Sequence, residues 1–288
     1  MRIKPLCPAC LLSRAYLEAK MATKDQNKIK KAIEVALKIL SEEYPKGGIN
    51  AVIATKMHRK VYEVLGTKDP YAEVKRKANM IALNSLPAVK DFINKQEDPF
   101  KASAIASIIA NTFDYGVMGH KVEEDFLDFF FKKYKRGLKI DNLDEIRKIV
   151  KNGYVVYLAD NAGEIVIDTL FMREIKKLCK WLTVVVRGRP ILNDATIGDA
   201  IIAKVDKVSD EVLTNGLGAI GIIEEELPPV TLKRLENADI IIAKGMANYE
   251  CLSEGRFKPI AFLLTAKCEP VAEDINVEIG DMVAILKS

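Results

Sequence analysis

The chain has 288 residues, of which 49% are hydrophobic and 29% charged, so it can bury the core of one large domain or two modest ones. Its 44 basic residues nearly balance its 40 acidic residues, and a net charge of +4 is too small to indicate a nucleic-acid-binding protein. No apolar run reaches the ~18 residues needed to span a bilayer, and the first residues lack the apolar stretch of a signal peptide. We therefore expect a cytoplasmic protein with no membrane partner.

The sequence begins with a CxxC motif, Cys7-Pro-Ala-Cys10. This spacing lets two thiolates share a metal ion or form a redox pair. A structural zinc site needs two more ligands, and no second pair of Cys or His residues follows. A redox motif normally follows a strand, whereas only six residues precede Cys7. Cys7 and Cys10 therefore remain a redox pair, a structural pair, or two buried thiols at a helix start.

Residues 1–150 are expected to form a helical N-terminal domain, because apolar residues recur there at helical spacing between Gly and Pro breaks. The segment 103–116 is a helix rich in small residues. Asn111 and Asp114 near its end are spaced i, i+3, which places both on one helix face. Two polar side chains at such a place cap the helix, lie buried with their hydrogen bonds made, or bind a ligand.

Residues 151–288 are expected to form an α/β domain, because strands and helices alternate there. Runs rich in Val and Ile are typical of buried parallel strands, and alternation with helices predicts a doubly wound α/β layer. The expected strands are 154–159, 182–188, 239–245, 259–267 and 281–287, and the segment 207–213 has a weaker strand pattern.

The first of these strands halts at Asp160 and Asn161, and a helix follows from Glu164. Ligands of open α/β sheets bind at the carboxyl ends of strands. The backbone N–H groups of Ala162 and Gly163 would open the helix and offer an anion site. The simpler interpretation is that Asp160 caps the helix and Gly163 only permits the turn.

Polar residues follow other strands in the same way. Asp160, Asn161 and Asp194 offer only oxygen atoms as metal ligands. An ion bound there would therefore be Mg²⁺ or Mn²⁺ in preference to Zn²⁺. Lys244 and Lys267 would neutralise a phosphate. A bound metal ion together with lysines around a phosphate is typical of phosphoryl transfer or hydrolysis. The residues that we expect to bind substrate or phosphate are Ala162, Gly163, Asn111, Arg187, Asn193, Asn248, Glu250 and Lys267.

Several motifs together resemble one family, the archaeal-type damage-control phosphatases, formerly called domain of unknown function 89. They are Asp160-Asn-Ala-Gly-Glu164, Arg187-Gly-x-Pro-x-x-Asn193-Asp194-Ala-Thr, Lys244-Gly-x-x-Asn248-Tyr249-Glu250 and Cys7-x-x-Cys10. The resemblance runs from the CxxC motif to the final strand, and this motif places the chain in the prokaryotic branch of the family.

The resemblance implies a helical N-terminal part followed by a Rossmann-like α/β/α domain. It also implies one divalent ion, Mn²⁺, Ni²⁺, Co²⁺ or Mg²⁺, with its ligands on Asp160, Asn161 and Asp194 by motif match. The implied activity is hydrolysis of phosphate monoesters of small metabolites, such as sugar phosphates, nucleotides or damaged phosphometabolites. Asn111 and Asp114 match an Asn-x-x-Asp stretch that would face the cleft.

In the resulting mechanistic hypothesis, the ion binds a phosphate oxygen and polarises a water, and Lys244 stabilises charge on the transferred group. Either Glu164 or Asp114 orients or deprotonates the water, and a phosphoenzyme on Asp160 or Asp194 remains an alternative. A non-catalytic sensor of phosphorylated metabolites or nucleotides is the competing function. Nothing in the sequence indicates the oligomeric state.

Overall fold

The structure is a computed structural model that describes residues 1–113 and 126–288. Its strands are β1 (Ile140–Asp141), β2 (Tyr154–Leu158), β3 (Trp181–Val186), β4 (Glu211–Thr214), β5 (Ile240–Lys244), β6 (Ile260–Thr265) and β7 (Met282–Lys287). Its α-helices are α1 (Cys7–Ala22), α2 (Gln26–Glu43), α3 (Asn50–Leu65), α4 (Ala72–Asn94), α5 (Pro99–Ala110), α6 (Phe126–Arg136), α7 (Leu143–Val150), α8 (Glu164–Leu178), α9 (Ile197–Ile202), α10 (Pro229–Glu236), α11 (Gly245–Leu252) and α12 (Glu269–Ile275). Short 3-10 helices are η1 (Tyr44–Lys46), η2 (Val205–Lys207) and η3 (Glu224–Glu226).

The strands form one sheet in the order β1-β7-β6-β5-β2-β3-β4. The pairs from β6 to β4 are parallel, whereas β7 runs antiparallel to β6 and pairs in parallel with β1. The central strand β2 lies between β3 and β5. The chain leaves β2 toward β3 and later returns to β5 on the other side, so the carboxyl ends of β2 and β5 form a topological switch point. Open α/β sheets bind their ligands at such points.

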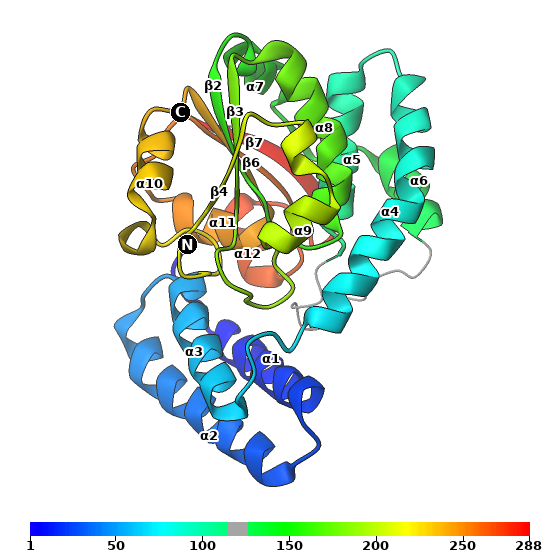
Figure 1. Ribbon diagram of the computed structural model, residues 1–288. Coiled ribbons are helices and arrows are strands. Elements are labelled where there is room, and N and C mark those ends of the chain that lie inside the picture. The colour runs from blue at the N-terminus through cyan, green and yellow to red at the C-terminus, as the bar shows by residue number, and fades with distance from the viewer. Residues whose placement is uncertain (114–125) are drawn as a thin grey trace.

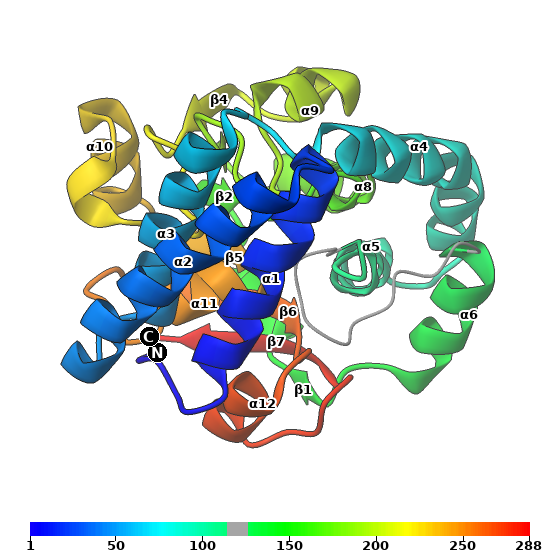
Figure 2. The ribbon, with the colours of Figure 1, turned by 90° about the horizontal axis from the view of Figure 1, so that it is seen from below.

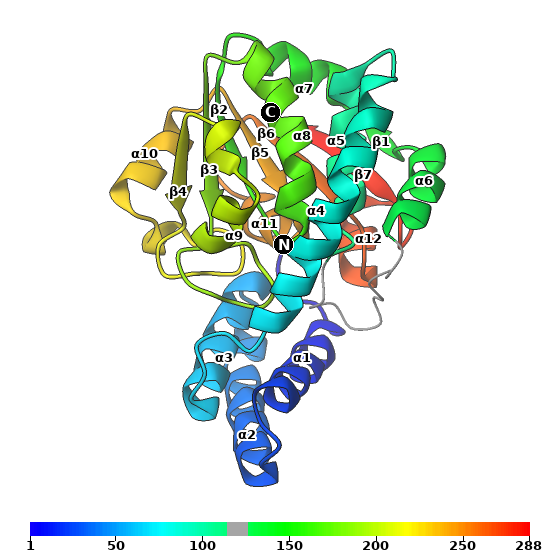
Figure 3. The same ribbon diagram turned by 45° about the vertical axis from the view of Figure 1, so that its right-hand side comes forward.

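Successive side chains of each strand point to opposite faces of the sheet, and both faces are covered. Val155 and Tyr157 of β2 belong to the core formed with α4, α5 and α8, while Val156 and Leu158 belong to the core shared with α3 and α11. Figure 3 shows α4, α5 and α8 in front of the sheet. The mixed α/β fold with a mostly parallel sheet, expected from the sequence, is thereby confirmed.

Helices α1, α2 and α3 pack on one another (Figure 1). Asp25 begins α2 by accepting a hydrogen bond of 2.9 Å from the backbone N–H of Asn27, and Gly66 ends α3 in the left-handed conformation. Side chains of α3 reach α11 and the loops that follow β3 and β4, and the three helices lie across that edge of the sheet in Figure 2.

The expected division of the chain at residue 150 needs correction. β1 lies within the first 150 residues yet extends the sheet, and α4 and α5 pack against α8 on its face. Both hydrophobic cores draw residues from either side of residue 150. Residues 1–150 are therefore not a separate all-helical unit. The sequence did not reveal this, because helical periodicity predicts that a helix forms but not which layer it joins.

Within the described ranges, no helix combines the length and the apolar character that crossing a membrane requires.

Candidate active site

Asp160, Asn161 and Asp194 are brought together beyond the ends of β2 and β3. The backbone N–H of Ala195 donates to the carbonyl oxygen of Asp160 at 2.7 Å, and Asn161 forms an isolated antiparallel bridge with Asp194. The chain then turns at Gly163, whose φ of 79° suits glycine, and a Cβ there would lie only 2.9 Å from the Cβ of Ala78 on α4. All three predicted ligand residues are buried.

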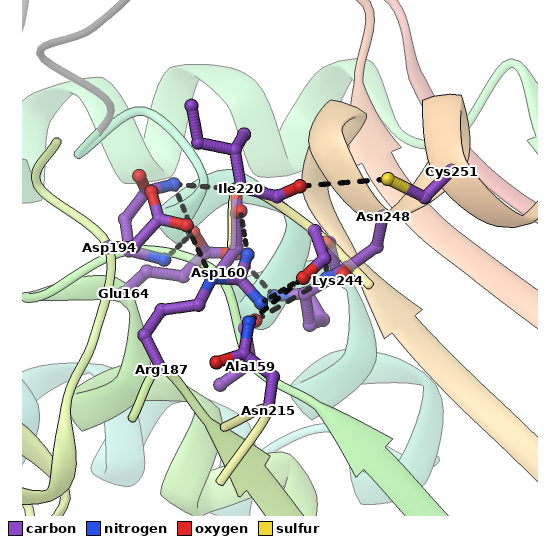
Figure 4. Close-up of polar contacts among 12 residues, drawn as sticks. Ala159, Asp160, Glu164, Arg187, Asp194, Asn215, Ile220, Lys244, Asn248 and Cys251 are labelled. Atoms are coloured by element: carbon purple, nitrogen blue, oxygen red, sulfur yellow. Dashed lines mark hydrogen bonds and ion pairs between the residues drawn. The ribbon is translucent and has the colours of Figure 1, made fainter. Parts of the chain in front are cut away.

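Arg187, which follows β3, lies between the two carboxylates (Figure 4). Its Nε donates to Asp194 Oδ2 at 2.6 Å, and its Nη2 lies 3.5 Å from Asp160 Oδ1. Burial alone would lower the pKa of Arg187, but Asp194 and Asp160 outweigh burial and raise it. The guanidinium therefore stays charged and holds both carboxylates, while its buried Nη2 has no hydrogen-bond partner among the described residues.

Lys244 is fully buried and does not line either cavity described below. Its ammonium donates to Glu164 Oε1 at 2.7 Å, to Asp168 Oδ1 at 2.8 Å and to the carbonyl oxygen of Ser107 at 3.0 Å. These three bonds use all its N–H donors. The structure therefore places Lys244 behind the site, where it holds Glu164, and a direct contact with phosphate would require these bonds to break.

Glu164 is the centre of a buried network. Its Oε2 accepts hydrogen bonds from the side-chain amides of Asn111 at 2.9 Å and Asn161 at 2.8 Å. Burial alone would raise the pKa of Glu164, but Lys244, Lys267 and the hydrogen bonds outweigh it, so the pKa is lowered. Both oxygens of an ionised Glu164 are thus engaged, and this arrangement suits orientation of Asn111 and Asn161 better than proton transfer.

Asp168 is a member of this network that the motif analysis missed. It accepts hydrogen bonds from Lys244 and, at 2.6 Å, from Ser107 Oγ. Burial raises its pKa to about 6, with Glu164 adding to the effect and Lys244 opposing it. A signal was present in the sequence, because Asp168 is an acid four residues after Glu164 in an otherwise apolar run of α8.

The expected anion site at the start of α8 has its donors engaged by the protein. The N–H of Ala162 donates to the carbonyl oxygen of Asn193 at 2.9 Å, and the N–H of Gly163 donates to Asn79 Oδ1 at 2.7 Å. Phosphate binding by Ala162 and Gly163 stays a prediction that needs these bonds to be exchanged.

Two other predicted substrate residues hold the site together. Asn193 donates from its side chain to Asn161 Oδ1 at 2.9 Å and to the carbonyl oxygen of Phe113 at 2.8 Å. Asn248 donates to the carbonyl oxygen of Lys244 at 2.7 Å. The side-chain oxygens of Asn111, Asn193 and Asn248 are buried without a hydrogen-bond partner. Asp114, the remaining residue of the expected Asn-x-x-Asp pair, lies outside the described residues.

Two cavities meet at this edge of the sheet. The smaller, of about 50 Å³, is lined by Asp160, Asn161 and Asp194, and its volume exceeds what one or two water molecules require. The larger, of about 200 Å³, is lined by Lys267 and by both cysteines of the CxxC motif. Both cavities share the lining residues Arg14, Asn50, Met246 and Glu250.

The residues at the smaller cavity fit a hard divalent cation. Among the described residues, no cluster of three or more His, Cys, Asp and Glu side chains could hold a metal. The predicted set is not a cluster of this kind, because it contains two aspartates and the amide of Asn161. Around the two cavities and in the network behind them, the buried carboxylates are those of Asp160, Glu164, Asp168, Asp194 and Glu250, and the buried cations are Arg187, Lys244 and Lys267. Five carboxylates against three cations leave two formal negative charges, which a divalent ion with oxygen ligands would balance.

The chain resembles known proteins over its whole length. The Damage-control phosphatase ARMT1-like domain matches residues 3–283. A damage-control phosphatase of Archaeoglobus fulgidus is 60% identical over 99% of both chains, and one of Pyrococcus horikoshii is 31% identical over 99% of this chain and 98% of the relative. The crystal structure of a DUF89 family protein from Pyrococcus horikoshii superposes with a TM-score of 0.89 at 30% identity and covers 100% of both chains. The chain therefore belongs to the ARMT1-like damage-control phosphatase family.

Proposed function

We propose that this protein is a metal-dependent phosphatase that hydrolyses phosphate monoesters of small metabolites. Membership of the family and the names of the Archaeoglobus and Pyrococcus relatives support the phosphatase activity. The observation that carries the proposal is that Asp160 and Asp194, from neighbouring strand ends, line one small cavity that adjoins a larger one. Sugar phosphates, nucleotides and damaged phosphometabolites are the proposed substrates.

Asp160, Asn161 and Asp194 would hold the ion, for which we propose Mn²⁺, Ni²⁺, Co²⁺ or Mg²⁺. When bound, a divalent ion supplies Lewis-acid activation of a phosphate oxygen and of an attacking water. Arg187 holds Asp160 and Asp194 in alignment through the contacts given above. In this role Arg187 prepares the ligand residues, whereas the sequence alone suggested a contact with substrate.

Lys267 is the lysine that we propose to pair with the phosphate. It lines the larger cavity, and its charge contributes to lowering the pKa of Glu164, so its field reaches the carboxylate that orients Asn161. Lys244 acts behind Glu164, whose carboxylate orients the amides of Asn111 and Asn161. The leaving group would occupy the larger cavity, beside Glu250 and the two cysteines.

The test is phosphate release from p-nitrophenyl phosphate, and then from a panel of sugar phosphates and nucleotides, by protein stripped with EDTA. We expect release only after Mn²⁺, Ni²⁺, Co²⁺ or Mg²⁺ is added back. Equal release in EDTA would refute the metal dependence. Tight binding of a phosphorylated metabolite with no turnover under any metal would instead favour the sensor function.

A further inference from the structure

Helix α3 presents polar side chains to α11 and to two loops at the carboxyl edge of the sheet. Asn50 donates to Glu250 Oε2 at 3.0 Å, and Thr55 Oγ1 accepts a hydrogen bond of 2.9 Å from the backbone N–H of Ile220. Tyr62, the last of these side chains, accepts a hydrogen bond of 3.0 Å from the backbone N–H of Leu192. Each of the three contacts thus joins α3 to a different segment of the α/β part.

The segment that Tyr62 holds is the one that carries Asp194. The backbone N–H of Asp194 bonds to the carbonyl oxygen of Ile191 at 3.2 Å, which closes a tight turn. Leu192 inside this turn has a φ of 46°. The left-handed region is unfavourable for a residue with a branched side chain, and such a conformation persists only where its surroundings enforce it.

The phenol of Tyr62 is oriented to enforce this conformation. Its hydroxyl donates to Glu18 Oε1 at 3.2 Å, and the other carboxylate oxygen of Glu18 lies 2.7 Å from His58 Nδ1. Because its only proton is directed at Glu18, the phenol oxygen is left to accept from Leu192. Tyr62, Glu18 and His58 are all buried, so water does not compete for these bonds.

We infer that Tyr62 is a positioning residue for the metal site, and that α1 and α3 act through its hydroxyl to hold the strained turn that presents Asp194 opposite Asp160. This inference rests on the proposed role of Asp194 as a metal ligand. Without the phenol oxygen, the buried N–H of Leu192 loses its acceptor, and the turn relaxes toward negative φ. Asp194, two residues later, then leaves its position.

The experiment compares Tyr62→Phe with Thr55→Val. Each substitution removes one hydroxyl that accepts a hydrogen bond from a buried backbone N–H of a loop, with little change in side-chain shape. Of the two hydroxyls, only that of Tyr62 bonds to the turn that carries Asp194. Loss of one buried hydrogen bond typically changes an equilibrium constant by about tenfold. We expect Tyr62→Phe to weaken Mn²⁺ binding about tenfold in calorimetry, and Thr55→Val to leave it within about twofold of wild type.

Hydrogen exchange on the metal-free proteins gives a second readout that does not depend on metal. Peptides that cover residues 188–196 should exchange faster in Tyr62→Phe and at the wild-type rate in Thr55→Val. Glycine adopts a positive φ without strain, so Leu192→Gly should lessen the effect of Tyr62→Phe on Mn²⁺ binding, measured against Leu192→Gly alone.

Wild-type exchange in residues 188–196 of folded Tyr62→Phe would overturn the inference, as would wild-type Mn²⁺ affinity in this variant. If the wild-type protein binds none of Mn²⁺, Ni²⁺, Co²⁺ and Mg²⁺, the proposed function fails, and the exchange comparison still decides whether Tyr62 holds the turn. An equal loss of Mn²⁺ affinity in Thr55→Val would also overturn the inference, because any lost contact of α3 would then weaken metal binding.

Discussion

Replacement of Lys244 by methionine removes a buried ammonium while nearly preserving the volume of the side chain. In the wild-type protein this ammonium lies 2.7 Å from Glu164 and 2.8 Å from Asp168, and all three side chains are fully buried. Loss of one partner from a buried ion pair typically costs ~3–5 kcal/mol, because the remaining charge has neither water nor a counterion. We therefore expect Lys244→Met to lose at least ~3 kcal/mol of unfolding free energy at pH 8.

The loss should depend on pH in a defined direction. Without Lys244, the pKa values of Glu164 and Asp168 in the folded protein rise, and that of Asp168 starts from about 6, above its value of about 4 in the unfolded chain. A carboxyl group whose pKa is raised by folding favours the folded state at low pH, and this contribution is lost as the pH rises through the folded pKa. The deficit of Lys244→Met should therefore be small near pH 4 and grow through pH 6 to pH 8.

Urea unfolding of the metal-free proteins at several pH values measures this effect. A second substitution, Asp168→Asn, supplies the control: in the Lys244→Met background it removes one unpaired buried charge and should restore part of the stability, whereas in wild type it should not stabilise. A loss below about 1 kcal/mol in Lys244→Met, together with a large fall in phosphate release, would refute this reasoning. Lys244 would then act on the phosphate, as the motif suggested.

Three further predictions concern the residues around the cavities. Asp194→Asn should lower the unfolding free energy of the metal-free protein by ~1–3 kcal/mol, because Arg187 loses an ionised partner at 2.6 Å; unchanged urea unfolding would show that this contact contributes nothing. Lys267→Ala should reduce phosphate release about a hundredfold with little change in melting temperature, and an unaltered rate would remove Lys267 from the phosphate site. Cys7→Ser with Cys10→Ser should retain metal-dependent hydrolysis, since both thiols line only the larger cavity; loss of bound Mn²⁺ in the folded double variant would place the cysteines in the metal site.

The sequence predicts the sheet well because its signals are local. The apolar runs that mark β2, β3, β5 and β6 fall where the strands lie, and parallel strands place their carboxyl ends at one edge. Asp160 and Asp194 therefore line one cavity there, in keeping with the order of the motifs. What the sequence does not give is the layer that α4 and α5 join, since an apolar stripe fits any apolar surface.

Side-chain direction explains why the expected role of Lys244 changed. Ile240 and Ile242 of β5 face the core formed with α8, and Ala243 faces the other core. By the period of two along a strand, Lys244 points with Ile242, beneath α5 and α8, and away from the cavities. This alternation along the strand could be predicted from the sequence. The hydrogen bond from the N–H of Gly163 to Asn79 could not, because Asn79 lies 84 residues away in the chain.

The measurement that tests the central claim most directly is calorimetric titration of Mn²⁺ into EDTA-stripped wild-type protein, Asp160→Asn and Asp194→Asn, with phosphate release from p-nitrophenyl phosphate assayed on the same samples. We expect one ion per wild-type chain, and at least about tenfold weaker binding in each variant with a parallel loss of phosphate release, because each loses one charged oxygen ligand. Wild-type Mn²⁺ affinity and wild-type phosphate release in both variants would contradict the assignment of the metal site to Asp160 and Asp194.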